Sequence, residues 1–264
     1  MTARSLLPAA LLAEWASIDT LVGDLTPEQW LAPTPCPGWD VRDQVAHIVA
    51  AEYVLAGRLG TPGETPDAEL YASVGMFMVD VREEPPRSLL ERFREITAER
   101  LATLCDLSAE EWTAETWTPV GPGTGDRLVR LRVFDCWMHE QDIRDALARP
   151  GHDDGPAAEI ALDEITRALP YALARSAGVP DGSVVTIETS GPAGRTWHIG
   201  VEAGRGRLVE QPGGEPGAWL RLPTGVFTRL CGGRIDPATA LSSVEIEGDA
   251  HLGPRVVASL AFTR

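Results

Sequence analysis

An acidic residue and a histidine stand four positions apart in RVFDCWMHEQDIRDAL, the segment that runs from Arg132 to Leu147. If this segment is a helix, Asp135 and His139 lie one turn apart on the same face. Asp142 follows three residues later on that side. A carboxylate and an imidazole at this spacing can bind one metal ion together.

His47 is a second candidate ligand from another part of the chain. It lies in a predicted helix, beside an apolar stripe that we expect to face the core. Metal sites in helical bundles are built from inward side chains of facing helices. Two imidazoles and one carboxylate would leave a fourth coordination position open, as in catalytic rather than structural zinc sites.

The spacing alone leaves a second interpretation open. A histidine beside an apolar face is often a hydrogen-bonded core residue, and Asp135 or Asp142 can satisfy it. The same carboxylates can instead pair with Arg132 or Arg144. For the other three histidines we expect structural or solvent-exposed roles: His152 in a Gly/Asp loop, His198 in a strand and His251 near a helix start.

The elements that must position the candidate ligands are helices. Apolar residues recur with a helical period in residues 8–25, 41–58, 87–107 and 126–147. Asp40 is the expected N-cap of the second helix, and Asp43 lies in its first turn. Residues 61–86 are rich in Pro and Gly at both ends and contain a short apolar piece. Four main helices joined by loops are typical of a bundle.

The pattern changes after Gly155. One further helix is predicted over residues 156–176, followed by segments of alternating polarity that predict strands. These are VVTIETS, RTWHIGV, RLVEQ, GAWLRLP and VEIEG. A helix that ends at Gly232-Gly233 precedes the last strand, and a final helix follows it. The sequence therefore predicts an α+β two-domain protein, with a helical bundle over residues 1–152 and a small α+β domain over residues 153–264.

Composition limits the possible partners. A hydrophobic fraction of 44% and a charged fraction of 23% are typical of a soluble globular protein. The formal net charge of -16 argues against a nucleic-acid partner or an anionic membrane surface. No apolar run is long enough to span a membrane, and no signal peptide is evident. We expect a cytoplasmic monomer. All basic residues are Arg and Asn is absent, which indicates a GC-rich genome.

Two segments resemble the metal-binding segments of the mycothiol-dependent maleylpyruvate isomerase family: TPCPGWDVRDQVAHIVAAE and RVFDCWMHEQDIRDAL. That family is similar in fold to DinB-like four-helix bundles. It binds a divalent metal, usually zinc, through a histidine on one helix and an acid-x-x-x-His pair on another. The resemblance implies that His47, Asp135 and His139 are the ligands. Asp135 departs from the pattern, because the characterised isomerase has Glu there.

The C-terminal half also resembles this family. GVFTRLCGGRIDP and VEIEGDAHLGPRVVASL are similar to segments of its sterol-carrier-like C-terminal domain. The resemblance implies that an arginine of this domain contributes to the active site. Arg229 and Arg234 are both candidates, because a guanidinium binds a substrate carboxylate well. Surface ion pairs are the alternative role for both.

The resemblance also implies a function. The metal would activate the thiol of mycothiol, a low-molecular-weight thiol, to attack an electrophilic small molecule. Isomerisation and S-transfer both remain open, and an actinobacterial source would fit the GC-rich codon usage. Two alternatives stay open as well: a non-catalytic module that binds a small molecule or a partner, and a hydrolase that uses metal-bound water.

Overall fold

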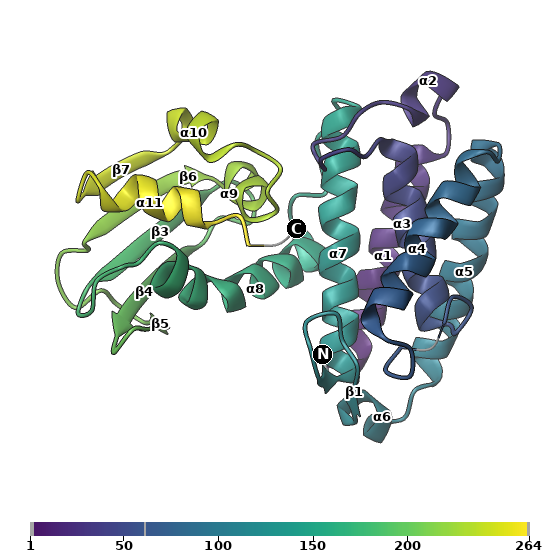
Figure 1. The fold of residues 1–264 in the computed structure, drawn as a ribbon, viewed down its shortest axis with the longest axis horizontal. Helices are drawn as coiled ribbons and strands as arrows, with labels where there is room; N and C mark the ends of the chain where they lie inside the picture. The colour runs from purple at the N-terminus through teal and green to yellow at the C-terminus, as the bar shows by residue number, and fades with distance from the viewer. Residues whose placement is uncertain (1–2, 61, 263–264) are drawn as a thin grey trace. The chain divides into compact units, whose positions relative to one another are not determined.

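Four long helices form the bundle of the first unit, residues 1–152. The computed structural model describes residues 3–60 and 62–262. Helix α1 packs against α5 and α7, and α3 packs against the same two helices (Figure 1). Their buried residues are mainly Leu, Ile, Val and aromatic side chains. The bounds are Ala3–Val22 for α1, Val41–Leu55 for α3, Pro86–Asp106 for α5 and Gly125–Ala146 for α7.

The start of α3 follows the sequence prediction. The Asp40 carboxylate accepts a hydrogen bond from the Asp43 backbone N–H at 2.9 Å. The Asp43 carboxylate in turn accepts one from the Asp40 N–H at 3.1 Å. This reciprocal capping box satisfies two N–H groups that a helix start leaves without partners. It fixes the first turn and therefore the direction in which His47 projects.

One further long helix, α4 (Asp67–Arg82), forms where the sequence analysis assigned none. It packs against α3, and the Phe77 ring lies 5.4 Å from the Tyr53 ring, centroid to centroid. Only Leu70 and Val81 of this helix are fully buried. Its other apolar residues are scattered around the helix, so no single apolar stripe shows in the sequence. Those exposed are Tyr71, Met76 and Val79.

Short elements complete the first unit. They are α2 (Pro27–Trp30), α6 (Ala109–Thr113), β1 (Glu115–Thr116) and β2 (Gly123–Thr124). Strands β1 and β2 form a two-stranded antiparallel ribbon just before α7.

The second unit, residues 153–264, is built on a five-stranded sheet of order β5-β4-β3-β6-β7. Strands β3 and β6 pair in parallel, and all other neighbours pair antiparallel. Each of the five predicted strand segments contributes one strand. Their bounds are Val184–Ser190 for β3, Thr196–Glu202 for β4, Arg205–Val209 for β5, Ala218–Pro223 for β6 and Glu245–Gly248 for β7.

Helices pack on this sheet. Helix α8 contacts β4 and β5, while α9 and α11 contact β6. The Trp197 ring of β4 stacks on the Phe227 ring of α9 at 4.9 Å, within the apolar core. The remaining bounds are Gly155–Tyr171 for α8, Ala172–Ser176 for a π-helical turn, Thr224–Cys231 for α9, Pro237–Ala240 for α10, Leu241–Ser243 for a 3₁₀ turn and Leu252–Ser259 for α11.

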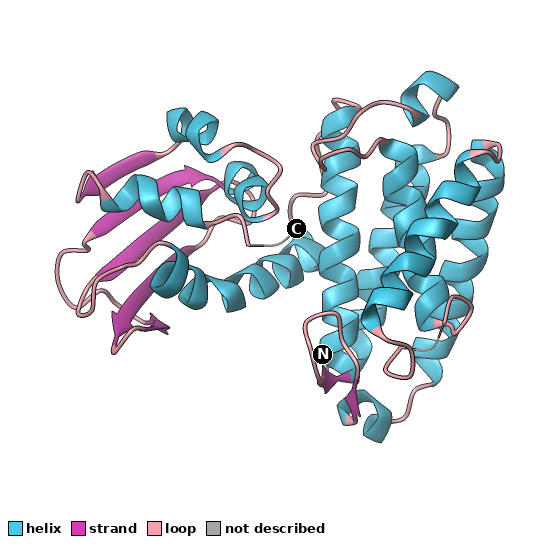
Figure 2. Cartoon of the chain, viewed as in Figure 1, coloured by secondary structure: helices cyan, strands magenta, loops and turns pink. Residues whose placement is uncertain are grey.

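The predicted fold class is confirmed. A helical N-terminal unit precedes a C-terminal unit that holds the main sheet (Figure 2). In the described part of the chain, every helix is too short or too polar to cross a bilayer.

Candidate metal centre

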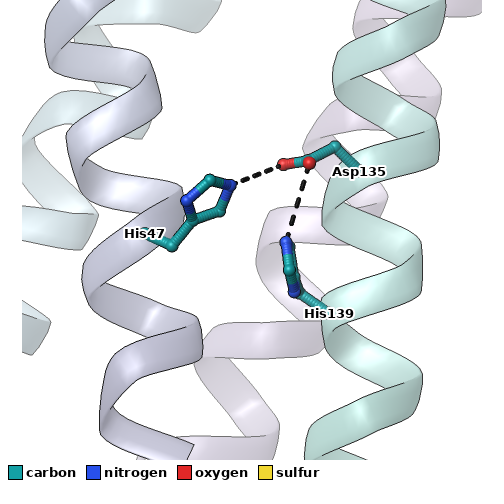
Figure 3. A group of neighbouring side chains, drawn as sticks. All are labelled: His47, Asp135 and His139. Atoms are coloured by element: carbon teal, nitrogen blue, oxygen red, sulfur yellow. Dashed lines mark ion pairs between the residues drawn. The ribbon is translucent and has the colours of Figure 1, made fainter. Parts of the chain in front are cut away.

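The three candidate ligands converge between α3 and α7. His47 projects from α3 toward Asp135 and His139, which lie one turn apart on α7 (Figure 3). His47 Nε2 lies 3.4 Å from Asp135 Oδ2, and His139 Nε2 lies 3.6 Å from Asp135 Oδ1. The carboxylate thus has one imidazole nitrogen beside each of its oxygens.

These distances match the requirements of a bound cation. Tetrahedral zinc with ligands at about 2.0–2.2 Å separates neighbouring ligand atoms by roughly 3.4 Å. One donor atom from each of the three residues lies within 4.8 Å of the others. The side chains of His47 and Asp135 keep 23% and 32% of their exposure, whereas that of His139 keeps 8%. A fourth ligand can therefore approach from the side of His47 and Asp135.

Trp39 covers the two imidazoles, a feature that the sequence analysis missed. Its ring centroid lies 5.1 Å from that of His47 and 5.5 Å from that of His139, nearly parallel to the latter. The Trp39 carbonyl accepts hydrogen bonds from the Thr34 N–H and hydroxyl, both at 2.9 Å. Gln44 of α3 donates to the Thr34 hydroxyl at 2.7 Å. The hydrogen bond from Gln44 to Thr34 therefore holds the loop that carries Trp39 against α3, the helix that carries His47.

A buried arginine holds Asp135 in place. Arg132 Nη1 donates to Asp135 Oδ2 at 2.6 Å, and Arg132 Nε donates to Glu52 Oε1 at 2.8 Å. Arg100 Nε donates to the other Glu52 oxygen at 3.2 Å. The sequence offered an ion pair of Asp135 with Arg132 as an alternative to a metal site. That ion pair is present, and the three candidate ligands converge as well. Arg132 contacts Oδ2 of Asp135, and Oδ1 of the same carboxylate faces His139.

The charges around the centre set the protonation states of the ligands. Burial alone would raise the pKa of Asp135, but Arg132 and the two imidazoles hold it well below its usual range. Burial lowers the pKa of His47 despite the nearby Asp135 carboxylate. Burial opposes the charge on His139 as well, yet Asp135 and Asp142 outweigh it and raise that pKa. An ionised carboxylate and a neutral His47 are the forms that bind metal.

Asp142 occupies the far side of the His139 ring. Its Oδ2 lies 3.7 Å from His139 Nδ1, and its side chain is almost fully buried. His139 Nδ1 is buried and has no hydrogen-bond partner. Carboxylates that face the free nitrogen of a ligating imidazole orient its ring. The position of Asp142 therefore suits a role in orienting the His139 ring.

The arginine candidates lie in the second unit. Arg229 belongs to the last turn of α9, and Arg234 follows that helix. Arg234 Nη1 donates to the Gly232 carbonyl at 2.7 Å. A role for either arginine at the metal centre stays a prediction. His198 meets the structural expectation, since its Nδ1 lies 2.8 Å from the Thr186 hydroxyl on the neighbouring strand.

Fold and site together define a two-domain protein with a candidate metal centre inside its helical bundle. Residues 11–144 match the family profile described as the mycothiol maleylpyruvate isomerase N-terminal domain. Residues 159–255 match the profile of the MDMPI C-terminal domain. The chain belongs to the mycothiol-dependent maleylpyruvate isomerase family, which confirms the resemblance seen in the sequence.

The chain is also similar to individual proteins. An uncharacterized protein of Mycobacterium tuberculosis, matched in two strains, is 28% identical over 200 residues, covering 73% of this chain and 76% of the relative. The crystal structure of the mycothiol-dependent maleylpyruvate isomerase superposes with a TM-score of 0.58 and 13% identity over 95% of each chain. A histidine-to-alanine mutant of that enzyme gives a TM-score of 0.60 and 14% identity over the same shares. At these identities the solved structures show a common fold.

Proposed function

We propose that this protein is a metal-dependent enzyme that uses mycothiol as a thiol substrate against an electrophilic small molecule. The metal would be divalent, with zinc the best fit, and His47, Asp135 and His139 would hold it. The observation that carries the proposal is the convergence of these three side chains at ligand spacing, in a member of this family.

A metal bound here would lower the pKa of a coordinated thiol, so that the thiolate forms near neutral pH. The surrounding residues keep the three ligands in the protonation states and positions that metal binding requires. Arg132 keeps Asp135 ionised and fixed, burial keeps His47 neutral, and Asp142 orients His139. Trp39 shields one side of the imidazoles from water.

The activated sulfur would attack an electrophilic carbon of the substrate. If the thiolate adds to a carbon–carbon double bond and is then eliminated, the double bond changes between cis and trans. If the sulfur stays and the neighbouring carbon takes up a proton, the product is an S-conjugate. Arg229 or Arg234 would bind a substrate carboxylate through paired N–H groups. We further propose a cytoplasmic monomer without nucleic-acid or membrane partners.

Metal analysis combined with an activity assay tests this function. Zinc would be measured by plasma mass spectrometry in the wild type and in His139→Ala, and maleylpyruvate isomerisation would be followed with and without mycothiol. We expect His139→Ala to lose one equivalent of zinc and all mycothiol-dependent turnover. His251→Ala, in the second unit, is the matched control and should keep both. Zinc-dependent hydrolysis of maleylpyruvate in place of isomerisation, with or without mycothiol, would instead favour a hydrolase that uses metal-bound water.

A further inference from the structure

A second group of ligand-type side chains lies on another side of α7. Glu140 directly follows His139, and neighbouring helix residues project about 100° apart. His139 therefore faces α3, while Glu140 faces α1, where it meets Glu14. His152, six residues beyond the end of α7, turns back onto both glutamates. From the sequence, only a structural or solvent-exposed role was expected for His152.

The three side chains share one small space. His152 Nδ1 lies 2.6 Å from Glu140 Oε2 and 3.5 Å from Glu14 Oε2. One donor atom from each residue lies within 4.8 Å of the other two, as in the first site. Both glutamates are 0% exposed, whereas the His152 side chain keeps 24%. The His152 side therefore offers a route from solvent to the buried carboxylates.

The carboxylate of Glu14 is buried without a hydrogen-bond donor. Neither of its oxygens has a hydrogen-bond partner. Glu140 is different, because its Oε1 accepts from the Ser17 hydroxyl at 2.5 Å and from Arg144 Nε at 2.8 Å. Those contacts leave Glu140 Oε2 on the side of Glu14 and His152. Two buried carboxylates that face each other require positive charge between them, either a proton or a metal ion.

The backbone holds His152 in an unusual conformation over this space. Its φ is 53°, in the left-handed region that side chains other than glycine rarely adopt. The His152 carbonyl accepts hydrogen bonds from Trp137 Nε1 at 2.9 Å and from Gln141 Nε2 at 3.2 Å. Both donors lie on α7, so the helix that carries Glu140 also fixes the position of the imidazole. Strained backbone kept by specific contacts is common at binding sites.

We propose that Glu14, Glu140 and His152 form a second divalent-cation site, separate from the proposed catalytic centre. Two carboxylates and one imidazole suit a first-row transition ion such as Zn²⁺ or Mn²⁺. Because His152 is the last residue of the first unit, a bound ion would fasten the segment after α7 to α1. Arg144 on the opposite oxygen of Glu140 balances the remaining negative charge.

Metal titration of the full chain tests the second site. The protein would be stripped with a chelator, dialysed against Zn²⁺ or Mn²⁺, and analysed by plasma mass spectrometry. We expect two equivalents in the wild type, one in Glu14→Gln, one in His139→Ala and none in the double variant. Glu91→Gln makes the same charge change on an exposed helix face and should keep two. A wild type that binds a single equivalent, kept in His139→Ala and lost in Glu14→Gln, would count against the proposed function and leave this site standing.

A shared proton gives the opposite result. Glutamine resembles a protonated glutamate, so Glu14→Gln would then keep the metal content of the wild type and unfold at the same or a higher temperature. That outcome overturns the proposal. If Glu14→Gln does not fold, His152→Ala replaces it, since that side chain is partly exposed. Unchanged binding of both equivalents in His152→Ala would overturn the proposal equally.

Discussion

Nε2 of His47 lies 3.4 Å from Oδ2 of Asp135, and this contact joins α3 to α7 across the proposed metal centre. The same carboxylate contacts His139 through its other oxygen. One aspartate therefore organises both imidazoles, and the centre depends on how closely the two helices pack.

Replacement of Asp135 by Asn should abolish tight metal binding. The amide keeps the size of the side chain but removes the charge, and it weakens the contact with Arg132. Loss of an outer-shell partner alone costs about 10- to 100-fold in metal affinity, so loss of a ligand should exceed about 100-fold. Competition with a chromophoric zinc chelator measures the affinity. Asp145→Asn, on the same helix, is the control, and equal affinities in the two variants would rule out Asp135 as a ligand.

Glu52→Gln should destabilise the bundle strongly. Glu52 is 1% exposed and accepts hydrogen bonds from Arg100 and Arg132. Removal of one member of a buried ion-pair network typically costs about 3–5 kcal/mol. Urea unfolding of the chelator-treated protein measures the change. Glu91→Gln removes an exposed partner of Arg87 and should cost less than about 1 kcal/mol. Similar midpoints for both variants would contradict a supporting role for the network.

The stability of the metal-free protein should depend on pH through His139. Asp135 and Asp142 raise its pKa in the folded state against the effect of burial, relative to about 6.5 in the unfolded chain. Its contribution to stability is then fully present below pH 6.5 and is lost as pH rises through the folded-state pKa. The unfolding free energy of the wild type minus that of His139→Gln should therefore fall as pH rises above about 6.5. A difference that rises over this range would contradict the raised pKa.

Trp39→Leu should weaken metal binding moderately while the fold persists. The tryptophan ring contacts both imidazoles and limits their rotation. Aromatic contacts contribute about 0.5–1.5 kcal/mol, which corresponds to roughly a two- to tenfold loss of zinc affinity. Isothermal titration with zinc measures this loss. Trp219→Leu, in the second unit, should leave the affinity unchanged, and an equal loss in both variants would argue against a role for Trp39.

One arginine of the second unit should affect substrate binding without affecting the metal. A charge-assisted hydrogen bond contributes about 1.5–3 kcal/mol, so Arg229→Met or Arg234→Met should raise KM roughly 10- to 100-fold. Zinc content should stay at the wild-type value in both variants. Steady-state kinetics with maleylpyruvate and mycothiol separates KM from kcat. An unchanged KM in both variants would exclude both residues as carboxylate-binding groups.

The sequence predicted those parts of the fold that rest on a regular pattern. The capped start of α3 and the alternating strands of the second unit follow local rules of hydrogen bonding and side-chain period. Helix α4 does not, because several of its large apolar residues remain exposed and Phe77 packs on Tyr53 of another helix. A contact between segments that are distant in the sequence does not change the spacing of apolar residues along the helix, so the sequence pattern does not predict it.

Around the candidate centre, too, the residues that share one element could be predicted and those joined by tertiary contacts could not. Asp135 and His139 share one helix, so their spacing alone placed them together. His47 was a candidate because it lies beside an apolar stripe that should face the core, and the resemblance to a family then grouped it with Asp135 and His139. Trp39, Glu52 and the approach of His152 to Glu14 depend entirely on tertiary packing. The roles of such buried charged residues can be assigned only when the tertiary structure shows which residues they contact.

The most direct test of the central claim is the electronic spectrum of the cobalt-substituted protein during titration with mycothiol. Direct sulfur coordination at a centre made of His47, Asp135 and His139 predicts intense sulfur-to-cobalt charge-transfer absorption that saturates at one thiol per chain. This absorption should be missing in His139→Ala. A wild-type spectrum that stays unchanged on addition of mycothiol would contradict a metal-bound thiolate.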